Sequence, residues 1–217
     1  MFCKLFNNFK KHPQNKIRFA SSSIFTKDYI NYSIYNVYSF NNDFIKLMNS
    51  LNPQLTGHII EELVTDIFKG NIISVNEFVI KHSIQNYINN VNIFITQVKS
   101  LSNTLNKNLT VNSQDNLSFK KIKCCRTKEY RCFADITTED YILDIKVVRK
   151  SFFLKDSIIK LSKVGLQYYN QLMCYAYGYK QKYNIWPNKL MLLNLYTGEY
   201  IVWEPNLFNY IHISKLI

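Results

Sequence analysis

The sequence contains no uninterrupted run of about 18 apolar residues, the length that a membrane-spanning helix requires. It therefore predicts no such helix. It also lacks a strongly basic amphipathic helix of the kind that lies on anionic membranes, so a membrane-surface protein is the least favoured class. No internal repeat or long linker divides the chain, and its 217 residues are enough for one large domain with a real core.

Cysteine pairs with the Cys-x-x-Cys spacing of metal and redox sites are absent. The five cysteines are odd in number, so we expect reduced thiols in an intracellular compartment rather than a disulfide framework. Cys124, Cys125 and Cys132 lie close in sequence, and a metal or iron–sulfur site there is conceivable. Because no fourth ligand follows at a suitable spacing, we favour buried or half-buried thiols on strands.

Acidic residues are missing from the first 27 positions, which hold six basic ones: Lys4, Lys10, Lys11, Lys16, Arg18 and Lys27. This composition is typical of transit peptides, and residues 17–23 (IRFASSS) resemble a cleavage region. Scarce arginine and the helix-breaking Pro13 disfavour that interpretation. We therefore expect a basic tail or targeting segment over 1–27, followed by a single domain over 28–217. The expected location is intracellular, and a mitochondrial protein or a viral protein in a host cell are the alternatives.

Positive charge is in excess, with 27 Lys and Arg against 15 Asp and Glu, a formal net charge of +12 and a pI of about 9.4. A domain this basic usually binds a polyanion, and nucleic acid is the first candidate. The heavy use of Asn, Ile and Lys also fits an AT-rich genome, which explains part of the excess without any function.

Hydrophobic periodicity predicts an alternation of helices and strands. Asn52 can cap a helix over 52–70, and Pro53 suits its first position. Helices are also predicted over 42–51, 75–101, 164–183 and 207–217, strands over 119–125, 130–136, 141–148, 189–196 and 199–204, and a loop over 103–116. This order predicts an α/β or α+β domain with one central mixed β-sheet flanked by helices.

Two charged residues interrupt the apolar strand predicted over 141–148. Asp144 and Lys146 are two residues apart, so on a strand they point to the same side. A simple ion pair on an exposed edge strand is one explanation. Asp135, near the end of the preceding strand, favours another, because a hairpin would bring it close to Asp144. Two carboxylates beside a lysine form an oxygen-rich site for a hard divalent cation.

This arrangement resembles the core of the PD-(D/E)XK nuclease superfamily. Ala134 and Asp135 match its "PD", and Asp144, Ile145 and Lys146 match its "(D/E)XK". The sequence departs from the pattern in having Ala for Pro at 134 and Asp for the commoner Glu at 144. Both are tolerated residue types.

A second match lies upstream, where GHIIE (57–61) is similar to the G-x-x-x-E helix signature of the λ-exonuclease-like branch. The spacing from Gly57 favours Glu61 as its functional residue. His58 and Glu62 are one helical turn apart, and a shifted H-x-x-x-E interpretation would make them the metal ligands instead.

A third match lies downstream, where QLMCY (171–175) is similar to the Q-x-x-x-Y signature of RecB-like nucleases. The closing hairpin at 195–204 also resembles that of RecB-like and viral members. Together the matches follow the family's order over roughly 52–205.

The resemblance implies a restriction-endonuclease-like α/β fold and a metal-dependent nuclease that hydrolyses DNA phosphodiester bonds. Glu61, Asp135, Asp144 and the Ile145 carbonyl would bind Mg²⁺ or Mn²⁺, and Lys146 would orient or help deprotonate the attacking water or offset charge on the phosphate. The expected products carry a 5′-phosphate and a 3′-hydroxyl.

Further roles follow from the same resemblance. Gln171 would help orient the site and Tyr175 would lie near the DNA, with Tyr168 extending that surface. The basic residues expected to contact phosphates include Arg126, Arg131 and Lys150.

No base-reading motif is evident, which favours cleavage that depends on DNA structure or ends. We expect an exonuclease or end-processing enzyme of replication, recombination or repair, acting on single-stranded DNA or duplex ends. A structure-specific endonuclease or junction resolvase of the same fold is one alternative. A non-catalytic nucleic-acid-binding module with a degenerate nuclease core is the other.

Overall fold

The computed structural model of the chain describes residues 32–33, 43–46, 53–105, 109–123, 126–155, 157–205 and 211. At 32–33, 53–55, 121–123, 126–129 and 157–160 it describes the backbone alone. The predicted basic segment over 1–27 and Cys124 and Cys125 lie outside the described residues, as does all of the predicted C-terminal helix except residue 211.

The helices of this part include α2 (Pro53–Phe68), α3 (Val75–Lys81), α4 (Ile88–Leu105) and α5 (Lys163–Tyr183), with the short 3-10 helix η4 (Gln85–Tyr87), and residues 43–46 are also helical. The strands are β1 (Tyr32–Ser33), β2 (Asn112–Asn116), β3 (Phe119–Lys123), β4 (Arg126–Tyr130), β5 (Phe133–Thr137), β6 (Tyr141–Lys146), β7 (Phe153–Leu154), β8 (Ser157–Leu161), β9 (Lys189–Asn194) and β10 (Glu199–Trp203). None of these helices is long and apolar enough to span a membrane.

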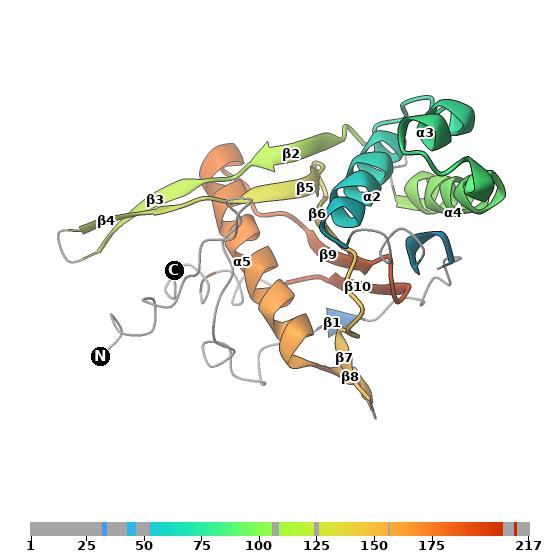
Figure 1. Ribbon diagram of the computed structural model, residues 1–217. Helices are drawn as coiled ribbons and strands as arrows, with labels where there is room; N and C mark the ends of the chain where they lie inside the picture. The colour runs from blue at the N-terminus through green and yellow to red at the C-terminus, as the bar shows by residue number, and fades with distance from the viewer. Residues whose placement is uncertain are drawn as a thin grey trace.

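Six strands form one sheet in the order β1-β10-β9-β6-β5-β2. Strands β6 and β9 are parallel, and the other neighbours are antiparallel. Helix α5 connects the parallel pair as a β-α-β crossover (Figure 1). The prediction of an α/β domain with a central mixed sheet flanked by helices is therefore confirmed.

Alternating side chains of the central strands pack against different helices. Leu143 and Ile145 of β6 belong to a hydrophobic cluster with α2 and α4, whereas Ile142 belongs to a second cluster with α5. Because side chains two apart on a strand share a side, Asp144 lies on the α5 side of the sheet. The two faces thus have different helical covers, and the charged residues of β6 lie under α5.

Helix α5 fits closely against the rest of the chain. Its N-cap, Ser162, accepts a hydrogen bond from the Gly165 amide at 3.2 Å, and Asn184 ends it with a left-handed φ of 60°. A Cβ at Gly178 would lie 2.0 Å from the Leu117 carbonyl oxygen, so only glycine permits this approach. The helix is thereby held against the chain between β2 and β3.

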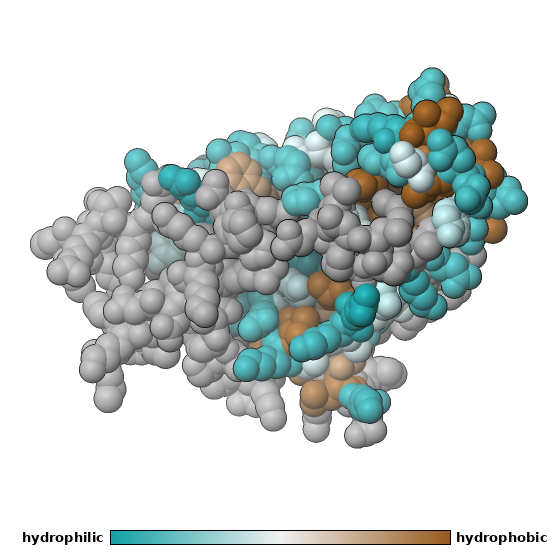
Figure 2. All heavy atoms as spheres, viewed as in Figure 1, coloured by the Kyte–Doolittle hydropathy of each residue, from teal (hydrophilic) through white to brown (hydrophobic). Residues whose placement is uncertain are grey.

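Strands β2 and β5 of the sheet continue into β3 and β4, which form a long two-stranded ribbon that projects from the sheet (Figure 1). Between the β2–β5 pair and the β3–β4 pair, the Leu117 amide donates a 2.8 Å hydrogen bond to the Cys132 carbonyl. At the opposite end of the molecule, apolar side chains are exposed around α3 and α4, among them Ile72, Ile80 and Ile93 (Figure 2).

Several predicted boundaries were wrong. Residues 112–116, predicted as loop, form β2, because pairing with β5 makes a strand of a polar segment. The strand predicted over 130–136 is divided between the end of β4 and β5. The helix predicted over 75–101 is divided near Ser83, whose φ of 56° no helix continues through. Strands β7 and β8 were not predicted.

Candidate active site

Asp135 and Asp144 meet where β5 and β6 stop pairing. Ile136 pairs with Leu143, so one step further along these antiparallel strands Asp135 lies opposite Asp144. Both side chains are fully buried. The Ile145 amide donates to Asp135 Oδ2 at 2.7 Å, and the carboxylate there takes the place of a backbone carbonyl. Two buried acidic groups therefore face each other on neighbouring strands.

Lys146 neutralises part of this charge. Its Nζ lies 2.5 Å from Asp144 Oδ2 and donates to the Ile145 carbonyl at 3.2 Å. The ammonium also lies 5.1 Å from the centre of the Tyr168 ring. Since β6 lies between β5 and β9, an ion pair on an exposed edge strand does not explain the two charges. The Lys146 side chain keeps 11% of its surface exposed, whereas that of Asp144 keeps none.

Helix α5 closes the site. Gln171 Nε2 donates to the Tyr175 hydroxyl at 2.5 Å, and both side chains are buried. Burial raises the pKa of Tyr175 well above its usual range, and the charges of Asp144 and Asp135 raise it further. The phenol is therefore neutral and lies near both carboxylates. Tyr175 has no exposed surface in this structure, and its place near the DNA stays a prediction from the resemblance.

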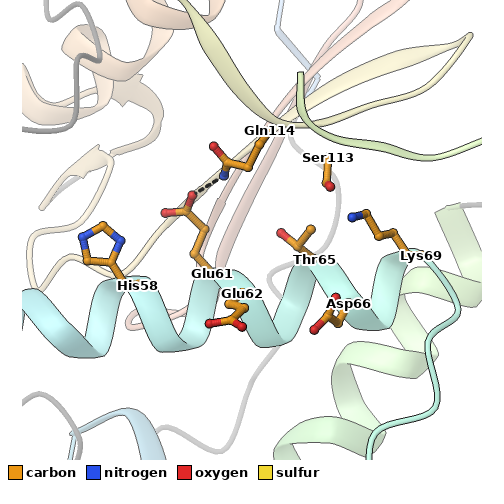
Figure 3. A pocket seen from close by; sticks show the side chains of 8 residues that line it. All are labelled: His58, Glu61, Glu62, Thr65, Asp66, Lys69, Ser113 and Gln114. Atoms are coloured by element: carbon orange, nitrogen blue, oxygen red, sulfur yellow. Dashed lines mark hydrogen bonds between the residues drawn. The ribbon is translucent and has the colours of Figure 1, made fainter. Parts of the chain in front are cut away.

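Glu61 lies on α2, on the face of the sheet opposite to α5, and approaches the sheet beside Asp135. Its Oε1 accepts a 2.6 Å hydrogen bond from Gln114 Nε2 (Figure 3). The β2–β5 register pairs Ser113 with Ile136 on one side of Gln114, which therefore lies opposite Asp135. Glu61 thus comes to the strand next to Asp135 and accepts its hydrogen bond from Gln114 there.

The predicted metal ligands are brought together only in part. In the described ranges, no three His, Cys, Asp or Glu side chains gather closely enough to hold a metal ion. Glu61 therefore does not complete a three-carboxylate group with Asp135 and Asp144. Those two carboxylates and the Ile145 carbonyl are nevertheless a hard oxygen donor set, and Mg²⁺ is commonly held by one or two carboxylates with water. Their chemistry fits the expected ion.

The alternative ligands, His58 and Glu62, lie one turn apart on α2 and line a pocket there. Glu62 is 3.7 Å from Lys81, in an ion pair whose side chains are each 64% exposed. His58 and Glu62 are thus two possible ligands, and no third acidic or histidine side chain lies near enough to them in the described residues.

The residues expected to contact DNA lie in different places. Arg131 and Lys150 are exposed, Arg131 between β4 and β5 and Lys150 after β6. Tyr168 is nearly buried and covers Lys146. The backbone of Arg126 begins β4, and its side chain lies outside the described residues.

Two side chains that sequence reasoning missed anchor the segment after Lys146. Asn194, the register partner of Lys146 on β9, accepts from the Val148 amide at 3.3 Å and donates to the Val148 and Lys150 carbonyls at 3.0 and 3.3 Å. Glu199 accepts from the Phe152 amide at 2.7 Å. The available signal in the sequence was a polar residue at one end of each apolar strand, because Asn194 ends KLMLLN and Glu199 begins EYIVW.

Comparisons with known proteins do not identify the chain. No family model and no curated protein sequence matches it. Among solved structures it is similar to the crystal structure of SSO0001, with 13% sequence identity and a TM-score of 0.34, over 75% of this chain and 84% of that one. A likeness this distant carries no argument about fold or function.

Proposed function

We propose that the protein is a metal-dependent DNA nuclease of the PD-(D/E)XK type, an exonuclease or end-processing enzyme. The observation that carries the proposal is the pair of fully buried carboxylates, Asp135 and Asp144, on adjacent central strands with Lys146 on Asp144. Isolated buried charges are costly, so a fold keeps them when they are paired or serve a site.

Each neighbouring side chain has a part in this proposal. Asp135 and Asp144, with the Ile145 carbonyl, would hold Mg²⁺ or Mn²⁺, which polarises a phosphate and lowers the pKa of a bound water. Lys146, the one charged group of the cluster with exposed surface, would orient that water and move its proton. Gln171 and Tyr175, bonded to each other, would help orient the acidic pair, and Asn194 holds the segment that follows Lys146. Glu61 stays a ligand predicted from the resemblance.

Substrate would lie along the ribbon of β3 and β4. The ribbon segment 119–131 contains six basic residues and one acidic one: Lys120, Lys121, Lys123, Arg126, Lys128 and Arg131 against Glu129. Charges on a projecting ribbon suit phosphate contacts that do not read sequence, and they make binding sensitive to salt. This favours DNA ends or single strands over a specific duplex site.

A second candidate function is a nucleic-acid-binding module without catalysis. It is favoured by the absence, in the described part of the chain, of three acidic or histidine side chains that could share an ion. In that case the Asp144–Lys146 pair would be purely structural, and the basic ribbon would carry the whole function.

Cleavage of labelled DNA separates the two. End-labelled single- and double-stranded linear DNA, and circular DNA, are incubated with Mg²⁺ or Mn²⁺ and wild type, Lys146→Ala, Asp135→Asn or Lys99→Ala. Lys99 is exposed on α4, so its variant is the matched control for loss of a lysine. We expect metal-dependent cutting of linear DNA by wild type and control, and none by the other two. Binding without cutting under every condition would favour the module instead, and cutting of circles would favour an endonuclease.

A further inference from the structure

The two faces of the β3–β4 ribbon differ in charge. Its register runs without a bulge from Phe119 opposite Tyr130 to Lys123 opposite Arg126, so residues two apart along either strand occupy one face. The face that holds Phe119 and Tyr130, here called the basic face, also holds four basic positions: Lys121, Lys123, Arg126 and Lys128. The other face holds one basic, one acidic and two uncharged positions: Lys120, Glu129, Ile122 and Thr127. A general excess of lysine in the chain does not explain why the charges are sorted by face.

Like charges oppose each other across the basic face. Lys121 is the register partner of Lys128. Lys123 is likewise opposite Arg126. On the other face, the one basic and the one acidic position are partners of opposite sign. Directly opposed like charges destabilise an antiparallel pair, and a bound polyanion neutralises them. Two such pairs in succession therefore indicate a binding surface for a polyanion.

A row of aromatic rings begins at the root of the basic face. The Phe119 and Tyr130 rings are stacked, with their centroids 4.8 Å apart and their planes at 12°. The Phe119 centroid also lies 4.8 Å from that of Tyr177 on α5, and the Tyr177 centroid lies 6.4 Å from that of Trp186. Phe119 and Tyr130 are buried, whereas Tyr177 and Trp186 are half-buried. The row is therefore packed at one end and keeps partly exposed rings at the other.

This combination favours single-stranded nucleic acid as the polyanion. Surfaces that bind single strands join cationic groups, which hold the phosphates, to aromatic rings on which unpaired bases stack. The bases of a duplex are already stacked on one another. Phe119 and Tyr130 belong to the hydrophobic cluster on the α5 side of the sheet, the side on which Asp144 lies. A strand bound along the basic face is therefore on the same side of the sheet as the candidate active site.

We propose that the basic face and the rings of Tyr177 and Trp186 together bind single-stranded DNA. The basic residues hold its phosphates, and an unpaired base stacks at Trp186. The inference rests on the proposed function for the choice of DNA, and it narrows the substrate from DNA ends or single strands to an unpaired strand. Binding at this surface does not require hydrolysis.

The test measures binding with a metal chelator present, so that this inference and the nuclease proposal can fail separately. A short fluorescein-labelled oligothymidylate is titrated with the full chain and followed by anisotropy, and its blunt duplex with oligoadenylate is the comparison. The variants are Lys121→Ala, Trp186→Ala and Trp186→Phe. Lys120→Ala is the matched control, because Lys120 is adjacent in sequence and occupies the other face.

Intrinsic fluorescence reports the stacking contact directly. The chain has two tryptophans, Trp186 and Trp203, and Trp203 is 1% exposed. Unlabelled oligothymidylate should therefore quench the emission of Trp186, and the quenching should be absent from Trp186→Phe.

Wild type and Lys120→Ala should bind the single strand with nearly the same affinity, and wild type should bind the duplex about ten-fold more weakly. Lys121→Ala should weaken binding several-fold and reduce the slope of log K against log salt by about 0.7. Trp186→Ala should weaken binding about ten-fold, and Trp186→Phe, which keeps an aromatic ring, should weaken it less.

Equal losses in Lys120→Ala and Lys121→Ala would overturn the assignment to one face. A duplex bound as tightly as the single strand, unchanged affinity in Trp186→Ala, or a folded wild type that neither binds nor is quenched by the oligothymidylate would overturn the proposal as a whole. Cutting by wild type with added metal would leave the nuclease proposal standing in each of these cases. Face-dependent binding of the single strand without cutting would support this inference and remove the nuclease proposal.

Discussion

The carboxylates under α5 and those on α2 lie on opposite sides of the same part of the sheet, in different surroundings. Asp135 and Asp144 are fully buried, with the Ile145 amide bonded to Asp135 and Lys146 paired with Asp144. Glu62 and its partner Lys81 are largely exposed. Water screens the Glu62–Lys81 pair but not the buried Asp144–Lys146 pair. Loss of the lysine should therefore cost much more stability on the buried side than on the exposed side.

The largest expected effect is on the buried side. Lys146→Met leaves the Asp144 carboxylate buried without its ammonium, and we expect a loss of about 3–5 kcal/mol in the free energy of unfolding, measured by urea denaturation. The double variant Asp144→Asn/Lys146→Met removes both charges and should recover most of the loss while staying inactive on DNA. A double variant no more stable than the single one would show that charge balance is not the cause.

The next largest effects are expected from glycine substitutions, whose change in stability should differ in sign between α5 and α2. Gly178→Ala in α5 would place a Cβ against the Leu117 carbonyl, and we expect a loss of about 1–3 kcal/mol in thermal or urea unfolding. Gly57→Ala in α2 meets nothing within 4 Å, so helix propensity should make it about 0.5–1 kcal/mol more stable. The same sign for both variants would contradict the tight packing of α5.

An intermediate case is the half-exposed pair of Asp140 and Lys189, whose charged atoms are 2.8 Å apart. Partial burial acts to raise the pKa of Asp140, but hydrogen bonds from Lys189 and Asn188 outweigh it and lower that pKa below its ordinary value. Its contribution is therefore present above the unfolded pKa of about 4 and is lost as pH falls through the lower folded pKa.

Asp140→Asn should accordingly be less stable than wild type at neutral pH, by no more than about 1 kcal/mol after allowance for solvent screening. The difference should shrink at acid pH. Urea midpoints at both pH values measure it, and a difference that grows on acidification would contradict the assignment.

The smallest effect is expected on the exposed side. Lys81→Gln removes the partner of Glu62 at 3.7 Å, and the free energy of unfolding should change by less than about 0.5 kcal/mol. A loss approaching that of Lys146→Met would mean that the α2 carboxylates are not screened as their exposure indicates.

Local sequence was enough for the elements with strong periodicity. Helix α5 begins one residue before its predicted start at 164 and ends where predicted, at 183. The strand predicted over 141–148 begins where predicted and ends two residues early, at Lys146. The spacing of Asp144 and Lys146 also put both groups on one side of a strand. These features depend on neighbours within a few positions, and such neighbours are visible in the sequence.

Other features depended on partners far along the chain. Strand β2 is too polar to be recognised without β5, and Asp115 within it is bonded by Lys182 and Tyr183, more than sixty residues away. The predicted convergence of Glu61 with Asp135 and Asp144 is not seen among the described residues, where Glu61 bonds to Gln114, a residue expected in a loop. The sequence by itself determined which side chains carry charge and how they alternate along each element. Only the tertiary structure decided which charges are buried together, because burial depends on which strands pair and which helix covers them.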